Sequence, residues 1–180
     1  MIKIIMINET ENYQKIINIF SKIKNQKTVI IGIGNQIKSD DGIGCKIIEE
    51  LKNYQNENYY FINVEENPEN YIGKIISIKP EFLLLFDAVD LSKKPGEFKI
   101  INYEELAESG FSTHNISLRY FLNTLFYELS NLKIFIIGIQ PKTINYSLEL
   151  SRELEEVKNY FVMIFKKELF ENNKTNSTNL

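Results

Sequence analysis

Short runs of apolar residues alternate along this chain with longer segments in which apolar residues recur every three or four positions. Such short runs are typical of strands that a parallel sheet buries on both faces. The expected strands cover residues 28–33, 59–64, 82–86, 97–101 and 133–139. The segment 97–101 follows the turn pair Pro95-Gly96 and alternates polar with apolar residues, which predicts a half-exposed strand at the edge of the sheet.

The segments between these runs each present one apolar stripe at helical spacing. The expected helices cover residues 42–53, 69–78, 117–129 and 147–167. This alternation predicts an α/β fold with a doubly wound, mostly parallel five-stranded sheet and helices on both faces. Ligands of such sheets bind beyond the carboxyl ends of the strands, so the candidate chemistry is sought in the loops that follow strands.

The two ends of the chain differ from this pattern. Residues 1–27 precede the first expected strand, and the apolar spacing within 9–26 predicts an amphipathic helix. Residues 28–168 are expected to form a single domain, because neither a linker nor an internal repeat interrupts the alternation. Residues 169–180 are expected to form a flexible tail, since the chain beyond 171 is rich in Asn, Ser and Thr.

Composition narrows the classes of function. The chain has 21 basic and 24 acidic residues and a formal net charge of -3, with no basic block, so nucleic acid is not an expected partner. Cys45 is the only cysteine, which excludes an intramolecular disulfide and a cysteine-based zinc site. No apolar stretch approaches the ~20 residues of a membrane span, and the start of the chain lacks the features of a signal peptide. We expect a cytoplasmic protein without membrane contact.

The loop after the first expected strand reads GIGNQIKSDDGIG over residues 32–44. A dinucleotide fingerprint would need a third glycine where Ile37 stands, and a phosphate-binding P-loop would need a Gly-Lys-Ser/Thr sequence that is missing. The loop instead places Asp40 and Asp41 directly before an expected helix, where a carboxylate could simply cap the helix N-terminus. The nearby glycines allow a sharp turn and the close approach of another molecule.

A second candidate carboxylate ends the third expected strand. Asp87 follows five apolar residues, within the sequence LLLFDAVD. In a sheet with strand order 2-1-3 this strand lies beside the first, so Asp41 and Asp87 could face each other. Capping of the following turn is the alternative role for Asp87. Asp90 is a weaker candidate, because it lies farther from the strand end.

His114 is the only histidine of the chain and stands in the sequence STHN, before an expected helix. A single histidine in a loop is more often a surface residue than a ligand. Together with Asp41 and Asp87, however, it would supply two carboxylates and one imidazole from three loops, a set that suits a divalent metal with open positions for a substrate. These ligands suit nickel or zinc and do not choose between them.

Five segments share their order and spacing with those of a known family. They are the loop GIGNQIKSDDGIG, the strand end LLLFDAVD, the later PGE turn, the STHN sequence and the GIQP sequence at residues 138–141. With these segments the chain resembles the nickel-iron hydrogenase maturation endopeptidases over about residues 28–165. The resemblance implies a five-stranded sheet flanked by helices. It also implies an enzyme that removes a C-terminal extension from the hydrogenase large-subunit precursor after nickel insertion.

The resemblance also assigns roles to residues. It implies that Asp41, Asp87 and His114 are the catalytic and metal-contacting residues and that Asp40 is a neighbour. The metal would be nickel that belongs to the substrate and marks it for cleavage, rather than a permanently bound cofactor. Cys45 lies inside the first expected helix, where a small buried thiol is expected rather than a nucleophile. We expect the enzyme to act as a monomer.

Two other functions stay open on the sequence alone. A hydrolase that owns its metal would hold zinc permanently with the same three residues. A nucleotide- or cofactor-binding module without catalysis would use the glycine loop. Residues 1–27 lie outside the resemblance, and the sequence TINYSLELS after GIQP matches it only loosely, so contacts specific to a substrate are not defined there.

Overall fold

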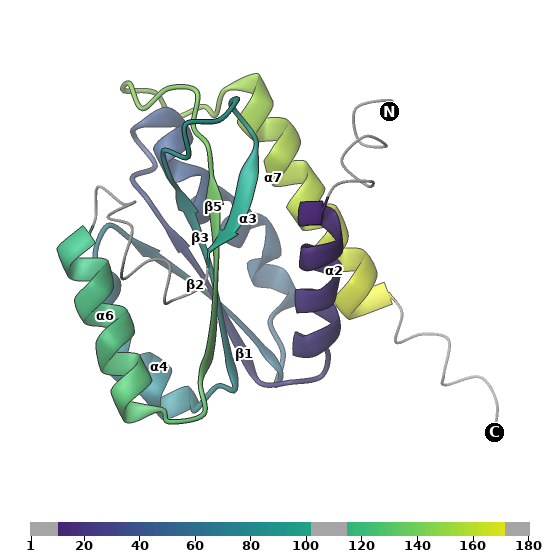
Figure 1. Ribbon diagram of the computed structural model, residues 1–180, viewed down its shortest axis with the longest axis vertical. Coiled ribbons are helices and arrows are strands. Elements are labelled where there is room, and N and C mark those ends of the chain that lie inside the picture. The colour runs from purple at the N-terminus through teal and green to yellow at the C-terminus, as the bar shows by residue number, and fades with distance from the viewer. Residues whose placement is uncertain (1–10, 102–114, 172–180) are drawn as a thin grey trace.

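The computed structural model describes residues 11–101 and 115–171, and its centre is a five-stranded sheet (Figure 1). The strand order is β2-β1-β3-β5-β4. The four strands β2, β1, β3 and β5 are parallel, and β4 pairs with β5 in the antiparallel sense. The strands are β1 Thr28–Ile33, β2 Tyr59–Glu65, β3 Phe82–Ala88, β4 Phe98–Ile101 and β5 Lys133–Ile139. The doubly wound α/β fold and the edge strand are therefore confirmed.

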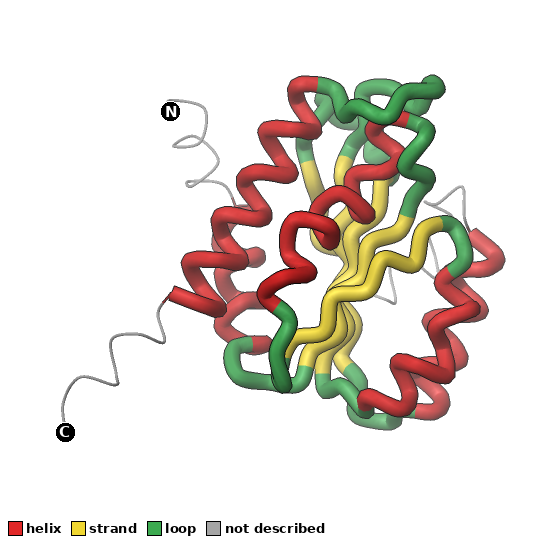
Figure 2. The backbone as a smooth tube through the Cα atoms, turned by 180° about the vertical axis from the view of Figure 1, so that it is seen from behind, coloured by secondary structure: helices red, strands yellow, loops and turns green. Residues whose placement is uncertain are grey.

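Helices cover both faces of the sheet (Figure 2). One face packs against the helices α2 Glu11–Ile23, α3 Ile43–Leu51 and α7 Arg152–Phe165. The other face packs against α4 Ile72–Ile78 and α6 Asn115–Glu128. This arrangement follows from the pleat of the strands, which sends successive side chains to opposite faces. In β3, Leu84 and Phe86 enter the first core, and Leu83 and Leu85 enter the second.

The segment 9–26 contains the expected amphipathic helix, and it packs on the domain itself. Helix α2 buries Ile16, Phe20 and Ile23 in the core that α7 shares. The ring of Phe20 meets that of Phe165 edge to face, with ring centroids 4.6 Å apart, a favoured geometry for an aromatic pair. The side-chain amide of Asn12 also donates to the carbonyl of Phe98 at 2.9 Å. The first residues described are thus part of the fold.

The last helix differs from expectation at both ends. It begins at Arg152 rather than at residue 147, because the backbone of residues 147–151 is hydrogen-bonded to the loop after β1 and cannot continue a helix. At its other end the chain continues as a π-helical turn, Lys166–Glu171, in which Leu169 is buried. Ordered packing therefore extends past residue 168, where the tail was expected to begin.

Within the residues that the structure describes, no helix is long and apolar enough to cross a membrane.

Replacement of Phe20 tests whether α2 contributes to the stability of the domain. Phe20→Ala removes a buried ring, so we expect the free energy of unfolding to fall by roughly 3 kcal/mol. Asn18→Ala on the exposed side of the same helix should change it by less than about 0.5 kcal/mol. Urea denaturation followed by circular dichroism measures both. Equal midpoints for the two variants would show that α2 adds nothing to the fold.

Candidate active site

The carboxyl ends of the parallel strands meet at one edge of the sheet, and two of the expected site residues lie there. Asp87 belongs to β3 and pairs in register with Gly138 of β5. Asp41 belongs to the 3-10 turn η1, Ser39–Gly42, in the loop after β1. This turn packs against β3. The topology thus brings the two carboxylates to the same edge of the sheet, one from the end of β3 and the other from the loop after β1.

Two glycines of the first loop allow backbone segments of the chain to pack closely against each other. Gly34 has a φ of 130°, and a Cβ atom on it would lie 1.7 Å from the carbonyl oxygen of Asp41. A Cβ atom on Gly44 would lie 2.4 Å from the carbonyl oxygen of Phe86. Glycine is therefore required at both positions, and it lets α3 approach β1 and β3 directly. The neighbour that these two glycines admit is the protein's own backbone rather than another molecule.

Asp41 is held by the backbone of its own loop. Its Oδ2 atom accepts a hydrogen bond of 2.9 Å from the backbone N–H of Asn35. The Asn35 side chain in turn donates to Glu66, beyond the end of β2, at 2.8 Å. The helix-capping alternative for Asp41 is wrong, since α3 has Gly42 at its N-cap position and no side-chain cap. Asp41 is buried, with 8% of its surface exposed, and its carboxylate is oriented by the loop.

Asp87 is 1% exposed and lies one residue beyond Phe86, the residue over which Gly44 packs. Burial of an aspartate at the end of a central strand is costly and is uncommon for a residue that serves only a turn. Asp90, the weaker candidate, is exposed, and its side chain accepts the backbone N–H of Ser92 at 3.0 Å. Asp90 therefore has a local role in the turn.

His114 lies outside the described residues, so its placement relative to Asp41 and Asp87 stays a prediction. Helix α6 begins at the next residue, Asn115. Its first turn is tied to the segment after β2, because the Ser117 hydroxyl donates to the carboxylate of Glu69 and thereby lowers the pKa of Glu69. Within residues 11–101 and 115–171, no three His, Cys, Asp or Glu side chains are placed to hold a metal ion. A metal held by Asp41 and Asp87 would need a further ligand from elsewhere.

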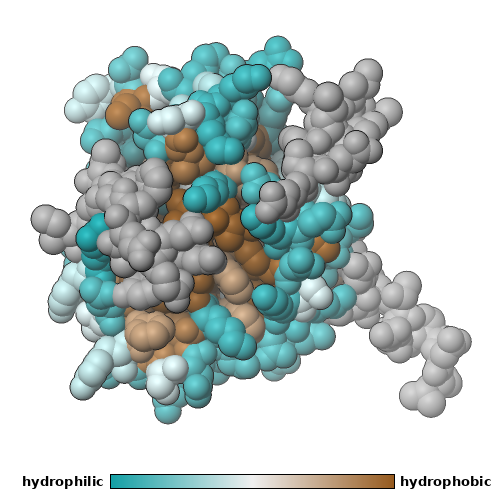
Figure 3. All heavy atoms as spheres, viewed as in Figure 1, coloured by the Kyte–Doolittle hydropathy of each residue, from teal (hydrophilic) through white to brown (hydrophobic). Residues whose placement is uncertain are grey.

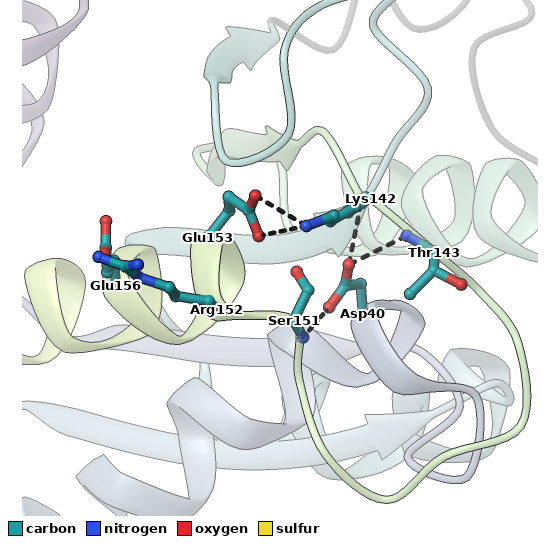
Figure 4. Close-up of polar contacts among 7 residues, drawn as sticks. All are labelled: Asp40, Lys142, Thr143, Ser151, Arg152, Glu153 and Glu156. Atoms are coloured by element: carbon teal, nitrogen blue, oxygen red, sulfur yellow. Dashed lines mark hydrogen bonds and ion pairs between the residues drawn. The ribbon is translucent and has the colours of Figure 1, made fainter.

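Asp40 has a role that the sequence did not reveal. It is fully buried. Its carboxylate accepts hydrogen bonds from three backbone N–H groups of the chain after β5 (Figure 4). The donors are Ser151 at 2.7 Å, Lys142 at 2.9 Å and Thr143 at 3.1 Å. Hydrogen bonds to a buried carboxylate are stronger than those between neutral groups. Asp40 therefore fastens residues 142–151 to the loop that carries Asp41.

Ser39 reinforces this connection. Its backbone N–H donates to the carbonyl of Ser147 at 2.8 Å, and its hydroxyl donates to the carbonyl of Glu149 at 2.8 Å. Ser39 itself has a φ of 50°, a left-handed conformation that costs about 1–2 kcal/mol for a residue with a side chain. The contacts with the opposite loop offset that cost.

Gln140 connects a third loop to these two. This residue of the GIQP sequence is 9% exposed, and its Oε1 atom accepts the backbone N–H groups of Leu91 at 2.7 Å and Lys93 at 3.2 Å. The loop after β3 is thereby joined to the start of the loop after β5. Asp40 and Gln140 together link the loops that follow the three central strands, β1, β3 and β5.

Cys45 is buried in α3, as expected, and its thiol donates to the carbonyl of Gly34 at 3.2 Å. Burial, assisted by the negative charge of Glu65, raises the pKa of the thiol from the usual 9.0 to about 12. The group is therefore protonated at neutral pH and is a poor nucleophile.

Replacement of Asp40 tests the connection between the loops. In Asp40→Asn the side chain presents an N–H group where three backbone donors converge, so we expect the free energy of unfolding to fall by roughly 1–3 kcal/mol. Faster amide hydrogen exchange at Lys142 and Ser151 should accompany the loss. Asp90→Asn is the matched control, since Asn keeps the acceptor for the local turn. Exchange rates at Ser151 equal to those of the parent would contradict this role of Asp40.

The buried thiol gives a second prediction. At pH 8 the thiolate fraction of Cys45 should be about a thousandfold smaller in the folded protein than in the unfolded chain. Iodoacetamide should therefore modify the protein in denaturant and leave the native protein unmodified, as read by mass spectrometry. Because the pKa is raised on folding, stability should fall as pH rises from about 9 toward 12. Rapid modification of the native protein would show that Cys45 is reactive.

The sequence and fold match those of known proteases. The sequence pattern of the hydrogenase maturation protease family HycI matches residues 45–167. The chain is 30% identical to the hydrogenase 3 maturation protease of Escherichia coli K12 over 129 residues, which is 71% of this chain and 81% of that protein. A Methanocaldococcus jannaschii protein provisionally named as a hydrogenase maturation protease is 36% identical over 137 residues, covering 71% of this chain and 80% of that protein.

A solved structure agrees with these sequence relatives. The crystal structure of the [NiFe] hydrogenase maturation protease HycI from Thermococcus kodakarensis superimposes with a TM-score of 0.77 at 29% identity, covering 86% of this chain and 98% of that chain. The relatives are named as proteases, so the alternative of a non-catalytic nucleotide-binding module is not supported. The chain belongs to the hydrogenase maturation protease family of peptide-bond hydrolases.

Proposed function

We propose that this enzyme removes the C-terminal extension of a nickel-loaded nickel-iron hydrogenase large-subunit precursor. The observation that carries the proposal is the convergence of Asp41 and Asp87 at one sheet edge, in a chain of the hydrogenase maturation protease family. The enzyme would act in the cytoplasm as a monomer, with one precursor molecule per cleavage.

In this proposal Asp41, Asp87 and His114 recognise the nickel ion of the substrate. Two carboxylates and one imidazole offer the oxygen and nitrogen ligands that nickel accepts. The hydrogen bond from Asn35 fixes the direction of the Asp41 carboxylate before any substrate arrives. Such preorganisation lowers the entropy cost of binding. The metal is part of the substrate, so a precursor without nickel would offer nothing for the three residues to hold.

In this proposal the substrate's nickel and the enzyme's three residues have different tasks in the cleavage. The substrate's nickel is a Lewis acid that can polarise a peptide carbonyl or activate a water molecule. The enzyme's residues position the scissile bond by holding the nickel at the sheet edge. Cys45 is not the nucleophile in this proposal, because it is buried and its pKa is raised. A hydrolase with its own zinc remains the alternative, which the nickel dependence of cleavage distinguishes.

Replacement of the three proposed nickel ligands tests their role. We expect Asp41→Asn, Asp87→Asn and His114→Ala each to lower the processing rate by at least about 100-fold, because each removes a direct contact to the metal. Circular dichroism should show that the variants keep their fold. Asp90→Asn, with an exposed carboxylate at the same end of the sheet, should process the precursor at the parental rate.

The assay compares precursor prepared with and without nickel, and cleavage is read by mass spectrometry as loss of the C-terminal extension. Only the nickel-loaded precursor should be cleaved. Equal cleavage of both preparations by an enzyme that retains a stoichiometric metal through gel filtration would support the zinc alternative and overturn substrate-nickel recognition. Parental activity of any of the three ligand variants would remove that residue from the site.

A further inference from the structure

Four large apolar side chains are exposed on the loops that surround the candidate active site. Tyr146 is 82% exposed and Leu148 is 69% exposed, and Ile37 and Ile144 are each more than half exposed. We call these four residues the apolar platform. Ile37 belongs to the loop after β1, and the other three belong to the loop after β5. In Figure 3 the top of the molecule is mostly hydrophilic, with one small hydrophobic patch at its upper left.

The two parts of the platform lie side by side. Lys38 and Ser147 form an isolated parallel bridge, in which the Ser147 N–H donates to the Ile37 carbonyl at 3.0 Å. The residues that precede each member of this bridge are Ile37 and Tyr146. The backbone at Ile37 is therefore held next to the backbone at Ser147, the residue between Tyr146 and Leu148.

The backbone beneath the platform is fixed although its side chains are exposed. Residues 140–151 contain no helix or strand, yet Asp40 holds this loop at both ends, at Lys142 and Ser151. Ser39 holds its middle through the carbonyls of Ser147 and Glu149. A long loop without secondary structure in a compact domain is commonly functional. This loop is anchored by buried groups and presents apolar side chains outward, as a preformed binding surface does.

The position of the platform identifies its occupant. Ile37 is in the same loop as Asp41, and Asp40 joins the other part of the platform to that loop. The platform therefore lies on the loop that carries Asp41 and on the loop fastened to it, beside the place where the proposed function puts a protein substrate. Lys142 and Glu149 are exposed in the same loop as the apolar residues, and transient protein interfaces likewise combine apolar with polar side chains.

We propose that the apolar platform is the docking surface for the body of the precursor, and that it contributes to the choice of precursor. It binds an apolar patch on the folded precursor, at a distance from the nickel and the scissile bond. This inference rests on the proposed function for the identity of the partner. The platform contributes binding energy without contact to the reacting atoms, so it affects capture of the precursor and leaves the cleavage step unchanged.

The test compares two double variants. Tyr146→Ala with Leu148→Ala removes half of the platform, and Tyr120→Ala with Tyr127→Ala removes two exposed rings from α6 as a control. Tyr127 is 85% exposed, which matches Tyr146. We expect the platform variant to raise KM for nickel-loaded precursor about tenfold, as loss of interface anchors does, with kcat within about twofold of the parent. The control should keep both parental values.

A binding measurement separates this inference from the proposed function. Nickel-free precursor, immobilised for biolayer interferometry, should bind the parent and the Asp41→Asn variant equally. The platform variant should bind it about tenfold more weakly. An unchanged Kd for the platform variant would overturn the docking surface even if processing depends on nickel. If no enzyme cleaves the precursor, the proposed function fails, and the Kd comparison still decides the docking surface.

Oligomeric state provides a third readout. Light scattering should show the same monomer mass for the parent and the platform variant. A parental dimer that the platform variant converts to monomer would overturn the inference, because the platform would then join two copies of this chain.

Discussion

The buried carboxylate of Asp40 connects loops that are 102 to 111 residues apart in the sequence. An aspartate in a protein interior is unfavourable unless its oxygens are satisfied, and three backbone N–H groups satisfy this one. Loss of the contact would leave those donors and the charge without partners. The candidate site depends on this interaction because the neighbouring residue, Asp41, takes its position from the same turn. The Gln140 bonds extend the connection to the loop after Asp87.

Much of the fold could be predicted because its signals are local. The apolar run of β3 is buried on both faces, and the alternating segment of β4 forms an edge strand, as their patterns indicate. The start of the last helix was not predictable from periodicity. Leu150 continues the apolar stripe of α7, but the N–H of Ser151 is bound to Asp40 more than a hundred residues away. A contact at that separation leaves no trace in the spacing of nearby residues.

The candidate site was predictable where topology determines it. Asp87 lies near the end of a central strand and Asp41 follows the strand beside it, so strand order alone places both at one edge of the sheet. The residues that hold the loops of the site in place were harder to predict from the sequence. Asp40 looks like Asp41 in the sequence, and only the three-dimensional structure shows that Asp40 binds three backbone N–H groups of the loop after β5, whereas Asp41 binds an N–H group of its own loop. Gln140 stands in the GIQP sequence that contributes to the family resemblance, but its uncharged side chain gave no sign that it links two loops.

The bonds made by Asp40 go to main-chain N–H groups, which every residue except proline possesses. The side chains of residues 142–149 can therefore be exchanged during evolution while the path of the loop persists. Proteins with this loop arrangement could acquire new partners by surface substitutions alone, without disturbing the acids beneath. The hydrogen bonds from the main chain to Asp40 would then allow the choice of partner to change while the cleavage chemistry stays the same.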